Sequence, residues 1–157
     1  MPAAVSAEEA RFINDMGLVL EADGRPRIAG LILGWLLICD PPHQSFSDLV
    51  AALGVSKGSV SSMTRLLMEA GLIERHVIGG DRQAYYRLAP DAWVRVLERQ
   101  VRVMEQLSAA AERGLAFVQG SARDAERLRE MHDLNRLAAD QIPAFIAAFE
   151  SSRRVQE

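Results

Sequence analysis

Residues 53–75 read LGVSKGSVSSMTRLLMEAGLIER, and their pattern is the strongest indication of the fold. Gly54 is placed to end one short helix, and the hydroxyl of Ser56 is placed to cap the start of the next. After Gly71 the spacing of apolar residues changes from that of a helix to that of a strand. The order of helix, tight turn, helix and strand predicts a helix-turn-helix followed by extended chain. The second helix would pack one apolar side on the core, formed by Val60, Met63 and Leu67.

A β-hairpin is predicted directly after this segment. Residues 72–78 and 83–88 are two strand-like runs, and they flank the turn GGDR at 79–82. Arg82 would project from the tip, where an arginine can enter the minor groove of DNA or contact its backbone. Asp81 is placed to orient the guanidinium group. The alternative is that Asp81 and Arg82 are ordinary turn residues.

Helices are predicted on both sides of the helix-turn-helix. A capping box of Ser6 and Glu9 would start a first helix that ends near Gly24. A second helix, apolar nearly all round, would run from 26 to 38, and Ser47 is expected to cap the short helix that Gly54 ends.

Two long helices are predicted in the last third of the chain. One begins near Asp91 and ends at Gly120, and another begins near Ala122. Pro143 is expected to kink or divide the second one, and residues 151–157 are expected to be frayed.

The fold class expected is mainly α with a small β-hairpin wing, which is a winged helix-turn-helix with a helical dimerisation region. The winged domain would span 43–90. Residues 1–42 would supply N-terminal helices for the domain core and for a dimer, and residues 91–157 would supply C-terminal dimerisation helices. These helices carry more apolar surface than one winged domain can cover, so a second copy is expected to bury it. The alternative is an intramolecular bundle.

Charge is distributed unevenly along the chain. The net charge is −3, which argues weakly against nucleic-acid binding. Residues 43–90 hold five basic residues against four acidic ones, and this is the one third of the chain with a net positive charge. Affinity for DNA would therefore depend on where the charges lie.

The helix that begins after Ser56 has an outer face of small polar side chains and two bases. Such a face is slim enough to enter the major groove, and Lys57 and Arg65 can each reach a phosphate or a guanine. Arg75, His76 and Arg87 could touch flanking phosphates or be solvated strand residues. The residues expected to contact double-stranded DNA are Ser56, Lys57, Ser59, Ser61, Ser62, Arg65, Arg75, Asp81 and Arg82.

Four segments of the sequence resemble GbsR-like regulators of the MarR superfamily. They are RPRIAGLILGWLL at 25–37, LGVSKGSVS at 53–61, GDR at 80–82 with YYRL at 85–88, and LREM at 128–131 with Asp133-Leu134. The likeness is strongest to mycobacterial regulators of RND-family lipid and drug efflux transporters. It implies a homodimeric repressor, a palindromic operator and an apolar or lipid-like effector bound between the dimer helices and the winged domain.

Other functions have less support in the sequence. Residues 29–39 form the longest apolar run, which two glycines interrupt and which is about half of what a bilayer needs. No signal peptide is expected, and a single cysteine indicates a reducing cytoplasm. Cys39 could sense oxidants, although its apolar neighbours favour burial. The three histidines are scattered, so neither a metal nor another cofactor is expected, and no motif indicates an enzyme. A winged domain used only for protein contacts remains an alternative.

An effector cavity is the last expectation. Aromatic and methionine side chains could line it, although such residues at helical spacing are more often core. The candidates are Phe12, Met16, Trp35, Trp93, Leu97 and Met104.

Overall fold

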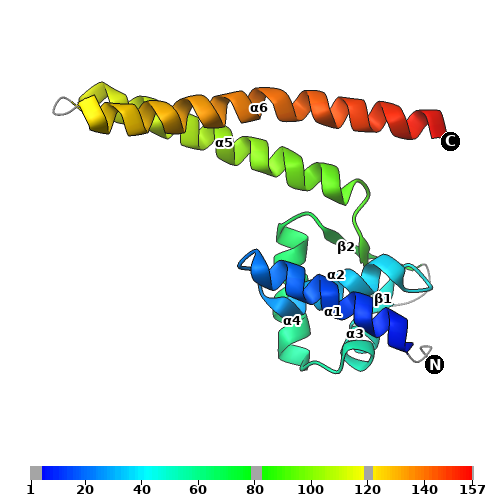
Figure 1. Ribbon diagram of the computed structural model, residues 1–157. Helices are drawn as coiled ribbons and strands as arrows, with labels where there is room; N and C mark the ends of the chain where they lie inside the picture. The colour runs from blue at the N-terminus through cyan, green and yellow to red at the C-terminus, as the bar shows by residue number, and fades with distance from the viewer. Residues whose placement is uncertain (1–4, 79–82, 119–121, 157) are drawn as a thin grey trace. The chain divides into compact units, whose positions relative to one another are not determined.

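The computed structural model describes residues 5–78, 83–118 and 122–156. The chain forms two compact units, Met1–Ala92 and Trp93–Glu157 (Figure 1). None of the helices in the described ranges has both the length and the hydrophobicity needed to cross a membrane.

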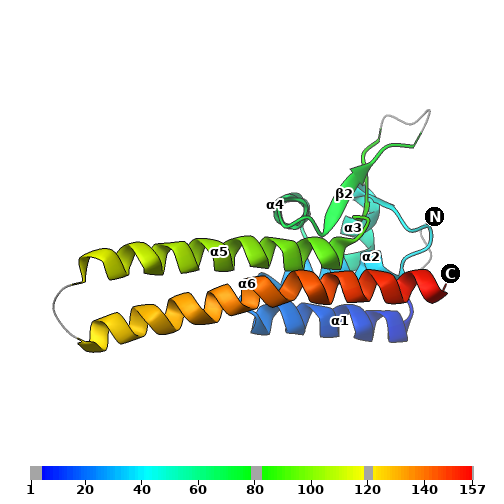
Figure 2. The same ribbon diagram turned by 90° about the horizontal axis from the view of Figure 1, so that it is seen from above.

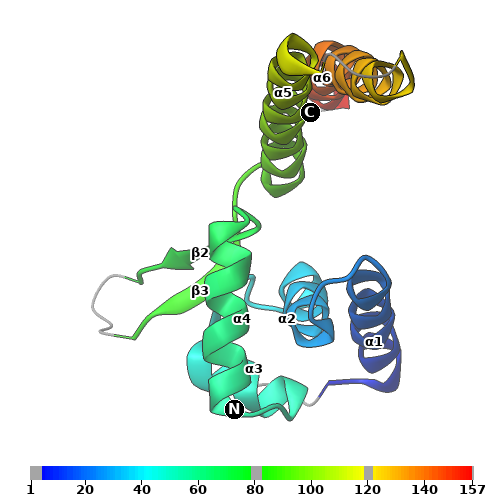
Figure 3. The same ribbon diagram turned by 90° about the vertical axis from the view of Figure 1, so that its left-hand side faces the viewer.

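The first unit combines four helices with a small antiparallel sheet (Figure 3). The sheet has the strand order β1-β3-β2, so β3 lies in the middle and pairs with both neighbours. The elements in chain order are α1 (Ala7–Ala22), α2 (Arg27–Ile38), β1 (Gln44–Ser45), α3 (Phe46–Leu53), α4 (Lys57–Glu69), β2 (Ile73–His76) and β3 (Tyr85–Leu88).

Helix α2 is central in this unit, as its apolar sequence predicted. It contacts α1, α3, α4 and β3. Its Ile32 and Leu33 are fully buried with Leu49 of α3 and with Val60 and Leu67 of α4. These side chains form the core, and their burial is the main favourable contribution to the stability of the unit.

Glycines bring α1 and α2 unusually close. A Cβ atom on Gly30 would lie 2.4 Å from the carbonyl oxygen of Met16 and 2.7 Å from the Cα of Gly17. A Cβ on Gly34 would lie 3.0 Å from the Cβ of Met16. The two backbones are therefore in direct contact, and the sequence permits this because no side chain stands between them.

The predicted capping residues are found at the start of α1 and at the end of α3, but a different residue caps the start of α3. Ser6 and Glu9 form the predicted capping box, and Gly54 ends α3 with a φ of 63°. Helix α3 is capped by Ser45 and not by Ser47. The Ser45 hydroxyl accepts from the amide of Asp48 at 3.1 Å, and the Asp48 carboxylate accepts from the amide of Ser45 at 3.0 Å.

Strand β1 was not predicted from the sequence. Its Gln44 side chain is buried, accepts a hydrogen bond from the indole nitrogen of Trp35 at 3.2 Å and donates to the carbonyl of Pro41 at 3.1 Å. These bonds satisfy two polar groups that would otherwise be costly to bury.

The second unit is a hairpin of two long helices, α5 (Ala92–Phe117) and α6 (Ala122–Gln156), which lie side by side (Figure 2). Each places a less exposed residue every three or four positions, as packed long helices do. Ser108 and His132 meet where the Ser108 hydroxyl donates to the His132 carbonyl at 3.4 Å. A Cβ on Gly114 would lie 3.1 Å from Leu128, so the helices also approach closely there.

The last helix differs from what the sequence predicted in two respects, a division at Pro143 and fraying of its end. Helix α6 is not divided at Pro143, whose ring is exposed. Residues 151–156 continue the helix, and the Ser151 hydroxyl donates to the carbonyl of Ala147 at 2.8 Å. The side-chain bond satisfies an acceptor near the end of the helix and supports its last turns.

Candidate nucleic-acid interface

Helix α4 begins with a closed polar cap. The Ser56 hydroxyl accepts from the amide of Ser59 at 3.1 Å, and the two hydroxyl oxygens lie 2.8 Å apart. Both hydroxyls therefore take part in the cap, as Ser56 was predicted to do. Their first role is to fix the start of α4 and the direction of its axis.

The side of α4 that faces away from the core is narrow and polar. Lys57, Gly58, Ser61, Ser62 and Arg65 are all exposed. Lys57, Ser61 and Arg65 follow one another at four-residue steps, and Gly58 and Ser62 lie beside them on the same helix face. Glycine, serines and two long basic side chains occupy the first turns of this face, which we call the α4 outer face, and the exposed Glu69 follows in the last turn of the helix.

The opposite side of α4 is buried in a slightly different way from the prediction. Val60 and Leu67 are buried as expected, but Thr64 is fully buried and Met63 is only half-buried. The Thr64 hydroxyl donates to the carbonyl of Val60 at 2.8 Å, so its polar atom is satisfied within the helix. Burial of a threonine is possible because of this local bond.

Strands β2 and β3 form the predicted hairpin next to α4 (Figure 3). Arg75 is exposed on β2, and Arg87 on β3 is paired with Glu74, with a nitrogen-to-oxygen distance of 2.7 Å. Because this ion pair neutralises the charge of Arg87, Arg75 is more available than Arg87 for a contact with DNA. Asp81 and Arg82 lie outside the described residues.

One hydrogen bond connects the hairpin to the helix-turn-helix. The Gln83 side-chain amide donates to the hydroxyl of Ser47 at 3.2 Å, and that hydroxyl lies 2.9 Å from the hydroxyl of Ser45. Because Gln83 follows the hairpin tip directly, the bond ties the returning strand to the start of α3. Sequence reasoning missed this contact, since the residues are far apart in the chain.

The six candidate cavity residues are divided between the two units. In the first unit Trp35 is buried in the core, Met16 is half-buried against α2, and Phe12 is more exposed. In the second unit Trp93 is half-exposed, whereas Leu97 and Met104 are partly buried along α5.

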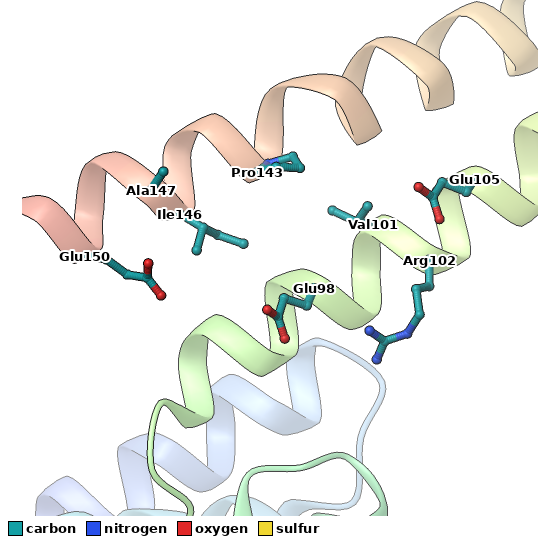
Figure 4. Close-up of a pocket in the computed structure, with 8 residues that line it drawn as sticks. All are labelled: Glu98, Val101, Arg102, Glu105, Pro143, Ile146, Ala147 and Glu150. Carbon is teal, nitrogen blue, oxygen red and sulfur yellow. The ribbon is translucent and has the colours of Figure 1, made fainter.

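The helical unit has a groove of its own between α5 and α6 (Figure 4). Its volume is about 500 Å³, and Val101, Pro143, Ile146 and Ala147 supply apolar lining. Four charged residues complete the lining, Glu98, Arg102, Glu105 and Glu150. With three carboxylates against one guanidinium, the groove favours a ligand that has both an apolar body and a positive charge.

Cys39 is buried at the end of α2. Burial raises the pKa of its thiol to about 11, because a thiolate loses its hydration there. The reactive thiolate is therefore scarce near neutral pH, which disfavours oxidant sensing at this residue.

Helices α3 and α4, the turn at Gly54 and the β2–β3 hairpin together define a winged helix-turn-helix, the class that the sequence predicted. Comparison with known proteins agrees. The profile of MmpR5-like MarR family transcriptional regulators matches residues 91–152, and the MarR family profile matches residues 23–84.

Two relatives make the assignment firm. HTH-type transcriptional regulator MmpR5 of Mycobacterium tuberculosis is 41% identical over 124 residues, which are 78% of this chain and 75% of that protein. A crystal structure of a transcriptional regulator is 35% identical, has a TM-score of 0.83 and matches over 92% of this chain and 99% of that chain. The chain belongs to the MarR family of transcriptional regulators. Its place in a GbsR-like subgroup stays a prediction.

Proposed function

We propose that this chain is a ligand-responsive transcriptional repressor that binds an inverted-repeat operator as a homodimer in the cytoplasm. The observation that carries the proposal is the α4 outer face. An ordinary solvated helix exposes mixed acids and bases, whereas Lys57, Gly58, Ser61, Ser62 and Arg65 are small or basic. This face can approach base edges in the major groove without a steric or electrostatic penalty.

Each basic residue of the interface has a separate role in the proposed complex. Lys57, in the first turn of α4, contacts a phosphate together with the partial positive charge of the helix start. Arg65, about two turns further on, reads a base edge. Arg75 and Arg82 on the hairpin contact the flanking backbone or minor groove.

Dimerisation is supported by apolar side chains that the chain alone does not cover. In the helical unit Leu134, Leu137 and Phe145 are between 60% and 66% exposed. On α1, Leu18 and Val19 are also exposed. A second copy would bury these surfaces and place two α4 helices about 34 Å apart, one turn of DNA.

The effector is proposed to be a small apolar or lipid-like molecule held by the helical unit. The groove of Figure 4 favours a form of it with a positively charged group, because Glu98, Glu105 and Glu150 line an otherwise apolar space. Binding of the effector would favour a dimer in which the spacing of the two winged units no longer matches that of consecutive major grooves of the operator. A cationic amphiphile should release DNA at concentrations where an alkyl sulfate of equal chain length does not.

The decisive experiment measures DNA affinity by fluorescence anisotropy with a duplex from the chain's own promoter region. Arg65→Ala should weaken binding by about 1–3 kcal/mol, and Lys57→Ala should reduce the salt dependence by about one unit of slope. Arg136→Ala, which removes an exposed arginine from α6, is the matched control and should change nothing. Unchanged binding by both α4 variants would leave the protein-contact alternative as the better account.

A further inference from the structure

Two of the three histidines, which are far apart in the sequence, come together at the end of the β2–β3 ladder that is nearer the turn. His43 directly precedes β1 and His76 ends β2. Their ring centroids lie 5.5 Å apart, with the ring planes tilted by 46°. Both side chains are half-buried. No local sequence pattern indicates this pair, because the pairing of β1 and β2 with β3 brings the two residues together.

We propose that His43 and His76 form a binding site for one borderline divalent transition metal, of the class of Ni²⁺ or Zn²⁺. Two imidazoles on one tetrahedral ion place their centroids about 5 Å apart, given a metal–nitrogen distance of about 2.0–2.1 Å. The observed separation of 5.5 Å is close to this value.

The ring of Tyr85 helps to hold one ligand in place. It meets the His43 ring edge-on, with centroids 5.3 Å apart and planes at 88°. Such edge-to-face contacts favour one ring orientation. Tyr85 also pairs with His76 across β2 and β3, so one residue of the central strand contacts or pairs with both histidines. A partly ordered pair loses less entropy when it binds an ion.

The charges near the pair do not oppose a cation. Glu74 and Arg87 lie one residue pair further along the same two strands, on the same face as His76 and Tyr85. Their ion pair at 2.7 Å cancels their charges. Within the described part of the chain no group of three metal-ligating acids, cysteines or histidines forms. Water would therefore complete the coordination, and the site would be weaker than a four-ligand structural zinc site.

Metal binding would join strands that do not contact each other directly. β1 and β2 lie on opposite sides of β3, so a His43–metal–His76 bridge would span the sheet. The bridge would stabilise the turn-side end of the β2–β3 ladder and raise the melting temperature of the folded chain.

The test uses the full chain without a histidine tag and Ni²⁺ as the probe, followed by isothermal titration calorimetry at pH 7.5. One ion per chain should bind, and His43→Gln or His76→Gln should each weaken binding about a hundredfold, since one imidazole alone loses the chelate. His132→Gln is the matched control, because His132 lies on α6 beside Asp133, and it should bind Ni²⁺ like the unaltered chain. Equal effects of all three substitutions, or none of any, would overturn the proposal.

A second measurement needs no substitution. In NMR spectra of the unaltered chain, substoichiometric Ni²⁺ should broaden the ring signals of His43 and His76 and leave those of His132 sharp. Broadening of all three histidines together would show that the pair is no site.

Discussion

The winged unit and the helical unit treat their apolar residues in opposite ways. The winged unit encloses Ile32, Leu33 and Leu67 almost completely, whereas the helical unit leaves Leu134 and Phe145 largely exposed. A side chain buried within one chain stabilises that chain alone, but an exposed apolar stripe gains stability only when something covers it. The comparison indicates that the winged unit has a well-enclosed core of its own, and it supports the proposal that a second copy covers the exposed side chains of the helical unit.

The largest effect is expected when a charged residue replaces one of the exposed apolar side chains of α6, which are Leu134, Leu137 and Phe145. Phe145→Glu should weaken dimer formation by about 4 kcal/mol, because a carboxylate would be buried without a partner at the interface. Analytical ultracentrifugation measures this, and circular dichroism should show an unchanged winged unit. Arg136→Glu is the control, since nine residues separate the two positions and place them on opposite sides of the helix. A dimer unaffected by Phe145→Glu would mean that the helical unit is complete in one chain.

The contact between α1 and α2 gives the next largest effect, and it acts within the winged unit. Gly30→Ala puts a methyl group 2.4 Å from a backbone oxygen. The helices must then separate, at a loss of about 3 kcal/mol in unfolding free energy. Urea denaturation checks this value. If the loss were below about 0.5 kcal/mol, the two backbones would not be in contact.

A smaller loss is expected from the buried amide of β1. Gln44→Leu keeps the volume but removes the acceptor of the Trp35 indole N–H and the donor to Pro41. Leaving these groups unsatisfied should lower the free energy of unfolding by about 1–3 kcal/mol. Gln100→Leu on the exposed side of α5 is the control and should be nearly neutral. Equal stabilities of the two variants would place Gln44 outside the core.

The smallest effect is expected at Gly58, where one substitution should change folding stability and DNA affinity in opposite directions. Gly58 is exposed in α4, and an added Cβ would meet nothing closer than 3.9 Å. Gly58→Ala should therefore stabilise the helix by about 0.8 kcal/mol. It should also weaken DNA binding, because the methyl group widens the α4 outer face. Thermal denaturation and anisotropy with the same protein sample measure the two quantities, and a gain in both would remove Gly58 from the interface.

Local signals in the sequence predicted much of the winged unit. Gly54 and Ser56 mark the turn between α3 and α4 through backbone conformation and capping, which depend on near neighbours. The exposure of Lys57, Ser61 and Arg65 also followed from helical spacing. These predictions succeeded because each depends on a few consecutive residues.

The parts that could not be predicted depend on distant partners. Strand β1 has only two residues, and its pairing with β3 defines it. The cap at Ser45 was assigned to Ser47 because both are serines before the same helix. The meeting of His43 with His76 requires the register of the sheet, which no local pattern encodes.

The central position of α2 has a mechanical consequence. At Gly30 its backbone touches the backbone of α1, and it contacts α4 on another side. Backbones in hard contact cannot absorb a displacement by rotating a side chain, as a layer of leucines could. A displacement of α1, whose Leu18 and Val19 are exposed, would therefore be transmitted through α2 to α4, the helix that carries Lys57 and Arg65. In this regulator, the glycines at the α1–α2 contact would pass a displacement of α1 on to α4.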